Sequence, residues 1–141
     1  MQQSQEAGST KVVLDAMGGD YAPAEPVKGA VDAVCARGDI TVILVGQEDV
    51  VRAELSKYQY PSGQIRVVHA EEVIETAEPP VAAIRTKKQS SIVVGMNLVK
   101  KKEADAFVSA GSSGAVLVGG QGIVGRIRGI ERPPLAPLIP T

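Results

Sequence analysis

The sequence predicts an α/β fold: a three-layer, Rossmann-like α/β/α domain built on a mostly parallel sheet. Short apolar runs rich in Val and Ile alternate with longer segments in which apolar residues recur at helical spacing. Aromatic residues make up only 3% of the chain and Trp is absent, so the core is expected to consist of Val, Ile, Leu and Ala, as in buried parallel strands. The length of 141 residues is enough for one domain with one core.

The first half of the chain predicts three strands and two helices in alternation. The strands are short β-branched runs at residues 11–14, 41–45 and 65–69. A helix is predicted over residues 23–36, and Cys35, on its apolar side, is predicted to be a core residue. Pro26 suits the first turn of this helix, and Gly38 suits its end. The apolar spacing over residues 48–58 predicts a second helix, which a Pro-Ser-Gly turn ends.

The second half continues the alternation less regularly. The acidic, proline-terminated segment 71–80 is predicted to be a loop, and residues 105–109 a fourth strand. Helices are predicted at residues 81–86, 90–102 and 115–127. The last apolar run, residues 135–139, is interrupted by Pro137 and has no helix after it. Because doubly wound domains normally continue with such a helix, residues 11–141 are expected to be the N-terminal portion of a single, longer α/β domain.

Composition excludes several classes of protein. Residues 1–10 are polar and lack the basic and apolar regions of a signal peptide, so we expect a disordered N-terminal extension. No apolar run reaches the ~20 residues that cross a bilayer, which predicts a soluble, cytoplasmic protein. One cysteine and one histidine allow neither an internal disulfide nor a Cys- or His-pair metal site, and neither a metal nor a cofactor is expected. A net charge of −1 and few aromatics argue against nucleic acid as a partner.

The loop after the fourth predicted strand has the composition of a phosphate site. It reads Ser-Ala-Gly-Ser-Ser-Gly-Ala and leads into a predicted helix. Glycines allow close approach of the backbone, and the first N–H groups of a helix lack partners within it. The candidate phosphate-binding residues are Ser109, Gly111, Ser112, Ser113 and Gly114. The alternative is an ordinary small-residue turn, and the loop is not a P-loop because no Gly-Lys-Ser/Thr follows.

A similar loop follows the first predicted strand. Asp15, Gly18, Gly19 and Asp20 lie in the stretch Asp-Ala-Met-Gly-Gly-Asp, directly after Val-Val-Leu. Because clefts of open α/β sheets lie at the carboxyl ends of strands, these four residues are predicted to line the substrate cleft. The alternative is a turn in which glycines take positive φ and aspartates cap the chain. Two such loops at equivalent strand ends indicate a phosphate-handling enzyme.

Three further features have both a structural and a functional interpretation. Arg85 and Lys88 belong to a small basic patch, which is a solvated helix face by default and a source of charge for phosphate if the cleft is adjacent. His69 ends a strand, either as a general base or as a hydrogen-bonded strand-end histidine. The Gly-x-Gly-x-x-Gly at residues 120–125 predicts either a dinucleotide site, which needs a strand directly before it, or a helix packed closely on the sheet.

Five stretches spaced along the chain resemble one family. They read VLDAMGGDYAP at 13–23, ILVG at 43–46, IRTKKQSS at 84–91, DAFVSAGSSGA at 105–115 and VGRIRGIERP at 124–133. From about residue 11 to residue 141 the chain is thereby similar to the phosphate acyltransferases of the PlsX type. The family's glycine loop usually reads Ser-Ala-Gly-Asn-Thr-Gly-Ala, so Ser112 and Ser113 stand in the places of Asn and Thr. Members are roughly twice as long as this chain, within the range of one large α/β domain.

The resemblance implies a reaction and its site. The fold would be like those of phosphate acetyltransferase and isocitrate dehydrogenase-like proteins. The reaction would move a fatty acyl group from acyl carrier protein to inorganic phosphate, giving acyl phosphate for phospholipid synthesis. The glycine loop and the Gly18–Gly19 loop would hold phosphate beside the thioester carbonyl, and positioning and oxyanion stabilisation would provide most of the catalysis without a metal.

The resemblance also implies partners and leaves two alternatives open. Family members are usually homodimers, and because a membrane acyltransferase uses their product, peripheral association with the inner face of the membrane is implied. A shortened, non-catalytic binding domain with the same fold is one alternative. A dinucleotide-binding module is the other. The catalytic residues, and the activity of the 141-residue chain by itself, are not implied by these motifs.

Overall fold

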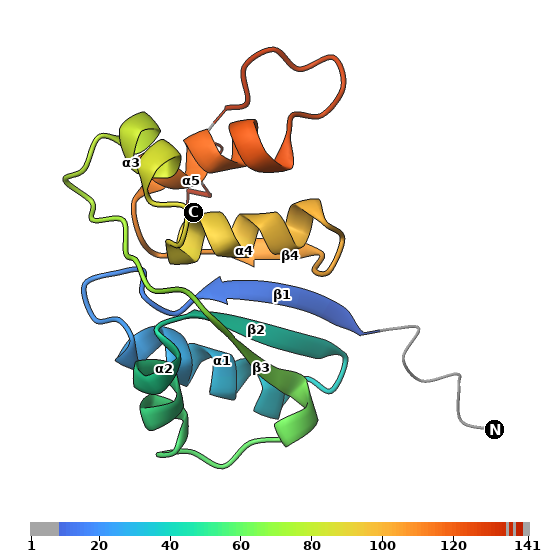
Figure 1. Ribbon diagram of the computed structural model, residues 1–141. Helices are drawn as coiled ribbons and strands as arrows, with labels where there is room; N and C mark the ends of the chain where they lie inside the picture. The colour runs from blue at the N-terminus through green and yellow to red at the C-terminus, as the bar shows by residue number, and fades with distance from the viewer. Residues whose placement is uncertain (1–8, 135, 137, 140–141) are drawn as a thin grey trace.

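The computed structural model describes residues 9–134, 136 and 138–139, and it confirms the predicted α/β architecture (Figure 1). Four strands form one parallel sheet in the order β3-β2-β1-β4. These strands are β1 (Thr10–Asp15), β2 (Ile40–Gly46), β3 (Ile65–His69) and β4 (Ala106–Val108). Within the described residues, β1 is therefore an interior strand and β4 is an edge strand.

The register of the sheet brings the ends of β1 and β4 together. Leu14 in β1 is the partner of Val108 in β4. The start of β4 is also held on β1, because the Asp105 backbone N–H donates to the Lys11 carbonyl and the Lys11 N–H donates to the Asp105 carboxylate, both at 2.8 Å. Since the two strands are parallel, the loops that follow them leave the sheet at the same edge, where ligand clefts of such folds lie.

Helices cover both faces of the sheet. α1 (Ala24–Ala36) and α2 (Glu48–Leu55) lie on one face, below the sheet in Figure 1, and α4 (Ser91–Lys100) lies on the other. α3 (Pro80–Thr86) and α5 (Ser113–Gly119) pack beyond α4. The buried hydrophobic side chains are aliphatic, as expected, apart from Met96; the largest are Val13, Val27, Val34, Leu44, Val45, Val51 and Ile92. A few polar side chains, among them Asp15 and Ser112, are buried as well.

The predicted boundary of the N-terminal extension is wrong by two residues. Ser9 and Thr41 share a hydrogen bond between their hydroxyls at 3.0 Å, and Thr10 begins β1. The other residues of the predicted extension, 1–8, lie outside the described residues. Of the final apolar run, positions 135 and 137 also lie outside them, and Leu138 and Ile139 are exposed and belong to no helix or strand.

The prediction that Cys35 belongs to the core is wrong, because this residue is exposed. The buried face of α1 consists of Val27, Ala30, Val31 and Val34. Cys35 comes one position after the last of these, near the end of the helix, and the sheet does not cover it there. Its Sγ lies 3.8 Å from the Gln59 carbonyl oxygen.

The last predicted helix begins earlier and ends earlier than expected. α5 begins at Ser113 instead of residue 115, because the Ser112 hydroxyl caps it. It continues as one stretch of π-helix, η2 (Gly120–Val124), and stops at Gly125, whose φ is +98°. Such a φ suits glycine and ends a helix. Predicted boundaries elsewhere are close, although α2 ends at Leu55 and not at residue 58.

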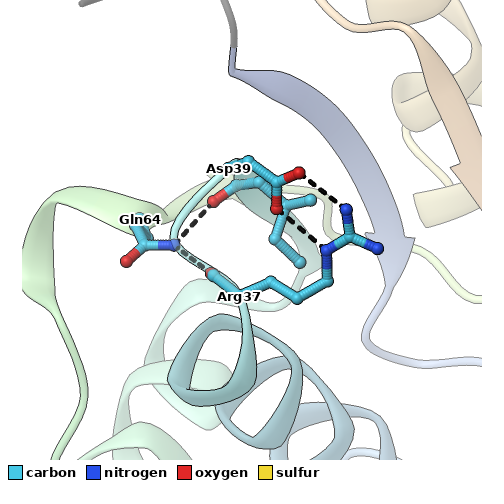
Figure 2. Close-up of polar contacts among 4 residues, drawn as sticks. Arg37, Asp39 and Gln64 are labelled. Carbon is cyan, nitrogen blue, oxygen red and sulfur yellow. Dashed lines mark hydrogen bonds and ion pairs between the residues drawn. The ribbon is translucent and has the colours of Figure 1, made fainter.

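The edge of the sheet opposite the two loops is closed by polar contacts around the start of β2 (Figure 2). The Gln64 side-chain amide donates to the carbonyls of Arg37 and Ile40, both at 2.8 Å. Arg37 forms a two-pronged ion pair with Asp39, at 2.8 and 2.6 Å, which lowers the pKa of the Asp39 carboxyl. These contacts join the end of α1 to the turn before β3. They also show that this edge has a structural role, whereas the candidate site lies at the other edge.

Among the helices of the described residues, none has both the length and the apolar character needed to cross a membrane.

Candidate functional site

Asp15 and Ser109 join the two loops that the sequence singles out. Asp15 is the last residue of β1 and is only 2% exposed, and Ser109 directly follows β4. The Ser109 hydroxyl donates to Asp15 Oδ2 at 2.9 Å, and the Met17 backbone N–H donates to Asp15 Oδ1 at 3.0 Å. The structure therefore brings the two loops into contact, with a buried carboxylate between them.

Glycines make this close approach possible. A Cβ atom on Gly18 would lie 2.8 Å from both Asp15 Oδ2 and Ser109 Oγ, and 2.9 Å from the Gly111 nitrogen. The Gly111 N–H itself donates to Ser109 Oγ at 3.0 Å. Gly19 has a φ of +103°, which confirms that the first loop uses a glycine at positive φ. The first loop is thus packed against the second with no room for a side chain between them.

The two serines of the glycine loop have different surroundings. Ser112 is buried, and its Oγ accepts the Ala115 N–H at 3.2 Å as the N-cap of α5. Ser113 is exposed. A Cβ atom on Gly114 would lie 2.7 Å from Pro80 Cγ, so this glycine allows α3 to pack against the start of α5. Of the two serines, Ser113 therefore has the side chain that is more accessible to a ligand.

Two grooves meet at Ser109, which lines both of them. The larger, here called the apolar groove, has a volume of about 670 Å³. Ser109, Gly111 and Ser113 of the glycine loop form its polar end, and Arg126, beyond the other end of α5–η2, also lines it. Its walls are mostly apolar and include Phe107, Val116, Leu117, Val124, Ile127 and Ile130. The smaller, here called the acidic groove, has a volume of about 430 Å³ and is lined by Asp15, Gly18, Gly19, Asp20, Tyr21 and Glu25 among others.

The charges of the two grooves separate the predicted site into two parts. Among the described residues, Arg126 is the one charged side chain that lines the apolar groove. The charged side chains that line the acidic groove are Asp15, Asp20 and Glu25, which repel an anion. The apolar groove therefore suits an anion better than the acidic groove does, and its Ser109 end packs against the first loop.

Arg85 and Lys88 lie away from both grooves. Arg85 is exposed on α3, Lys88 is exposed just after it, and neither lines the apolar groove or the acidic groove. Lys87, which lies between Arg85 and Lys88 in the sequence, forms an ion pair with Glu78 at 2.8 Å and donates to the Val73 carbonyl at 2.8 Å. The structure thus favours the interpretation of this patch as a solvated helix face.

Sequence reasoning missed Arg126 as a site residue. It lies just after Gly125, where the chain leaves η2, and its guanidinium also donates to the Glu131 carbonyl. The stretch VGRIRGIERP signals the family, but its two first arginines look alike until the turn at Gly125 is known. Only the position of this turn brings Arg126 to the apolar groove.

The Gly-x-Gly-x-x-Gly pattern does not have the structure of a dinucleotide fingerprint. Its first two glycines lie in η2, which continues α5, and no strand directly precedes them. The prediction that these glycines allow close packing is also wrong, because a Cβ atom on Gly120, Gly122 or Gly125 would meet nothing within 4 Å. The close approach belongs to Gly119, where a Cβ would lie 2.5 Å from Met96 Sδ of α4.

His69 is a hydrogen-bonded histidine at the end of a strand, the structural one of its two interpretations. Its Nδ1 accepts the Glu48 backbone N–H at 3.1 Å, at the first residue of α2. It belongs to β3, two strands away from β1, and lines neither the apolar nor the acidic groove.

Comparison with known proteins identifies the family. A family model described as "Fatty acid synthesis protein" matches residues 10–141. The chain belongs to this family. It is 54% identical over 131 residues to a phosphate acyltransferase of Alkaliphilus oremlandii and 50% identical over 131 residues to one of Dictyoglomus turgidum; each match covers 93% of this chain.

The matches also show how much of the relatives this chain represents. It spans about 39% of the length of these two phosphate acyltransferases, which are therefore more than twice as long as the matched segment. Among solved structures, a phosphotransacetylase from Streptococcus pyogenes matches with a TM-score of 0.62 and 21% identity, over 89% of this chain and 41% of that one. This likeness confirms the phosphotransacetylase-like fold that the resemblance implied.

Proposed function

We propose that this chain forms part of an enzyme that transfers a fatty acyl group from acyl carrier protein to inorganic phosphate, giving acyl phosphate for phospholipid synthesis. Membership of the fatty acid synthesis family, with relatives named phosphate acyltransferase, supports this reaction. The apolar groove is the single structural observation that carries the proposal, because one continuous cavity has a polar end and a long apolar wall.

The groove matches the two substrates by chemistry. At its polar end, the Ser113 hydroxyl can donate to phosphate. The Arg126 guanidinium, beyond the other end of α5–η2, gives the groove a positive charge and several N–H donors. The apolar wall suits an acyl chain, since burying each CH₂ group is worth about 0.8 kcal/mol. Phosphate and thioester would thus meet near Ser109, where the polar and apolar parts join.

The chemical step needs positioning more than it needs a reactive side chain. An oxygen of hydrogen phosphate attacks the thioester carbonyl carbon, a C–O bond forms, and the C–S bond breaks. The proton carried by hydrogen phosphate ends on the departing sulfur, which leaves as the carrier-protein thiol. Holding phosphate in line with the carbonyl removes much of the entropic barrier, and N–H donors aimed at the carbonyl oxygen stabilise the developing charge.

The family resemblance extends the proposal to partners. Acyl carrier protein supplies the acyl group, and inorganic phosphate accepts it. A homodimer and peripheral association with a membrane stay predictions that follow from the resemblance. The non-catalytic alternative differs in one respect: such a domain binds phosphate without releasing thiol.

Phosphate-dependent release of thiol from palmitoyl-acyl carrier protein tests the proposal. We expect release by this chain only when inorganic phosphate is present. Arg126→Gln removes the one charged side chain that lines the groove among the described residues, and it should lower the rate by roughly tenfold, the low end for one charged hydrogen bond to an anionic substrate. Arg66→Gln is the matched control, because Arg66 is exposed on β3 and lines neither groove.

Two results would contradict the proposal. Equal release with and without phosphate would show that phosphate is not the acceptor. Absence of release from a folded sample, with phosphate still bound, would support the non-catalytic alternative for the 141-residue chain.

A further inference from the structure

Ser109 faces the polar end of the apolar groove with its proton already engaged. A hydroxyl has one proton to donate, and that of Ser109 is donated to Asp15 Oδ2 at 2.9 Å. The acceptor is firmly held, because Asp15 is 2% exposed and its other oxygen accepts the Met17 N–H at 3.0 Å. The proton of Ser109 is therefore directed into the protein, away from the groove.

Neighbouring groups keep Ser109 in this orientation. The Gly111 N–H donates to Ser109 Oγ at 3.0 Å, which uses one lone pair of that oxygen and one N–H that phosphate would otherwise bind. On the inner side, Gly18 lies so close that a Cβ there would be 2.8 Å from Ser109 Oγ. The side of Ser109 left for a ligand is thus the remaining lone pair, which accepts hydrogen bonds and repels an oxygen that has no proton.

This arrangement distinguishes two anions of similar size and shape. At neutral pH inorganic phosphate carries at least one P–O–H donor, whereas sulfate has acceptors only. A site that presents a fixed acceptor binds the ligand that can donate and rejects the one that cannot. Building on the phosphate site proposed above, we propose that Asp15, acting through Ser109, makes the polar end of the apolar groove selective for hydrogen phosphate over sulfate.

Asp15 is thus a positioning residue that sets specificity without touching the ligand. In Asp15→Asn, the side-chain oxygen can still accept the Met17 N–H, and the new NH₂ group donates to Ser109 Oγ. The Ser109 proton is then free to turn toward the groove and donate to sulfate. Ser109→Ala removes the acceptor altogether and provides a second variant that does not depend on the buried amide.

Calorimetric titration of the folded chain with inorganic phosphate and, separately, with sulfate measures this selectivity. We expect the wild-type chain to bind phosphate at least about tenfold more tightly than sulfate, the discrimination expected for one hydrogen bond at a charged site. In Asp15→Asn and in Ser109→Ala the ratio should fall to within about threefold. Asp39→Asn is the matched control, because it makes the same change in charge at the opposite edge of the sheet and should keep the wild-type ratio.

The outcomes separate this inference from the proposed function. Equal binding of phosphate and sulfate by the wild-type chain would overturn the inference and leave the phosphate site standing. A wild-type preference that persists in both variants would assign the selectivity to other groups and would also overturn it. Failure of the wild-type chain to bind either anion would overturn the phosphate site itself, and the selectivity with it.

Discussion

The two strand-end loops have similar sequences and different roles. The first loop, residues 16–20, follows an interior strand, and two of its small residues, Ala16 and Gly18, are buried. The second, residues 109–112, follows the edge strand β4 and borders the apolar groove. Small residues in the first loop serve packing between the loops. In the second, Gly111 takes part in the same packing, while Ser109 and Gly111 also line the apolar groove.

The position of the parent strand explains the difference. β1 has neighbours on both sides, and Asp15 at its end is a buried acceptor for Ser109, although Gly19 and Asp20 later in the loop are exposed. β4 has a described neighbour on one side only, and its loop leads directly into α5. Loop composition alone therefore does not distinguish a supporting loop from a binding loop; the order of strands in the sheet does.

The largest expected effect follows from the packing of the first loop. Gly18→Ala places a methyl group within 3 Å of two oxygens and a nitrogen, and should lower the free energy of unfolding by about 1–3 kcal/mol. Gly29→Ala in α1, where a Cβ meets nothing within 4 Å, should instead raise it by about 0.5–1 kcal/mol. Urea denaturation compares the two. If Gly18→Ala lowers the free energy of unfolding by no more than Gly29→Ala raises it, the first loop is not tightly packed.

A smaller effect distinguishes the two serines of the second loop. Ser112→Ala removes the N-cap of α5 and should cost about 1 kcal/mol of stability. Ser113→Ala should change stability by less than about 0.5 kcal/mol, since Ser113 is exposed, and should weaken phosphate binding instead. Thermal unfolding and phosphate titration of both variants check the division. Reversed effects would mean that the roles assigned to the two hydroxyls are interchanged.

The smallest effect concerns the support of the second loop by α3. Lys87, the C-cap of α3, donates to Glu78. This hydrogen bond, followed by one from the Glu75 N–H, lowers the pKa of Glu78 below its ordinary value of 4.5. A carboxyl with a lowered pKa in the folded state contributes stability above its unfolded pKa and loses it as the pH falls through the folded value. The stability difference between wild type and Glu78→Gln should therefore shrink on acidification.

Urea denaturation at pH 7 and at successively lower pH measures that difference. Glu103→Gln, at an exposed position before β4, is the control for the loss of one surface carboxyl. A gap between wild type and Glu78→Gln that stays constant with pH would contradict the role of the Glu78–Lys87 pair.

Local patterns predicted the fold better than they predicted the site. Strands such as β2 and β3 are found where β-branched runs predict them. The signal is clearest for β2, which is buried on both faces. Cys35 was misplaced because helical spacing alone does not show how far the sheet extends along α1. The start of α5 was missed because a serine cap contributes no apolar signal.

The site depended on contacts between distant residues. Parallel strands predicted that both loops leave the same edge of the sheet. Their contact, the Asp15–Ser109 hydrogen bond between residues 94 positions apart, also required β4 to lie next to β1. The separation into an apolar and an acidic groove was not predictable, because it depends on β4 being next to β1. Arg126 was missed because its place at the groove depends on the turn at Gly125.

Titration of the ¹⁵N-labelled chain with inorganic phosphate, followed through its backbone amide resonances, tests the different roles of the two loops most directly. We expect saturable shifts of the amide resonances that are largest at Ser113 and Gly114, beside the apolar groove, and smaller at Gly19 and Asp20 in the acidic groove. Largest shifts at Gly19 and Asp20, or no saturable shift at any amide, would contradict it.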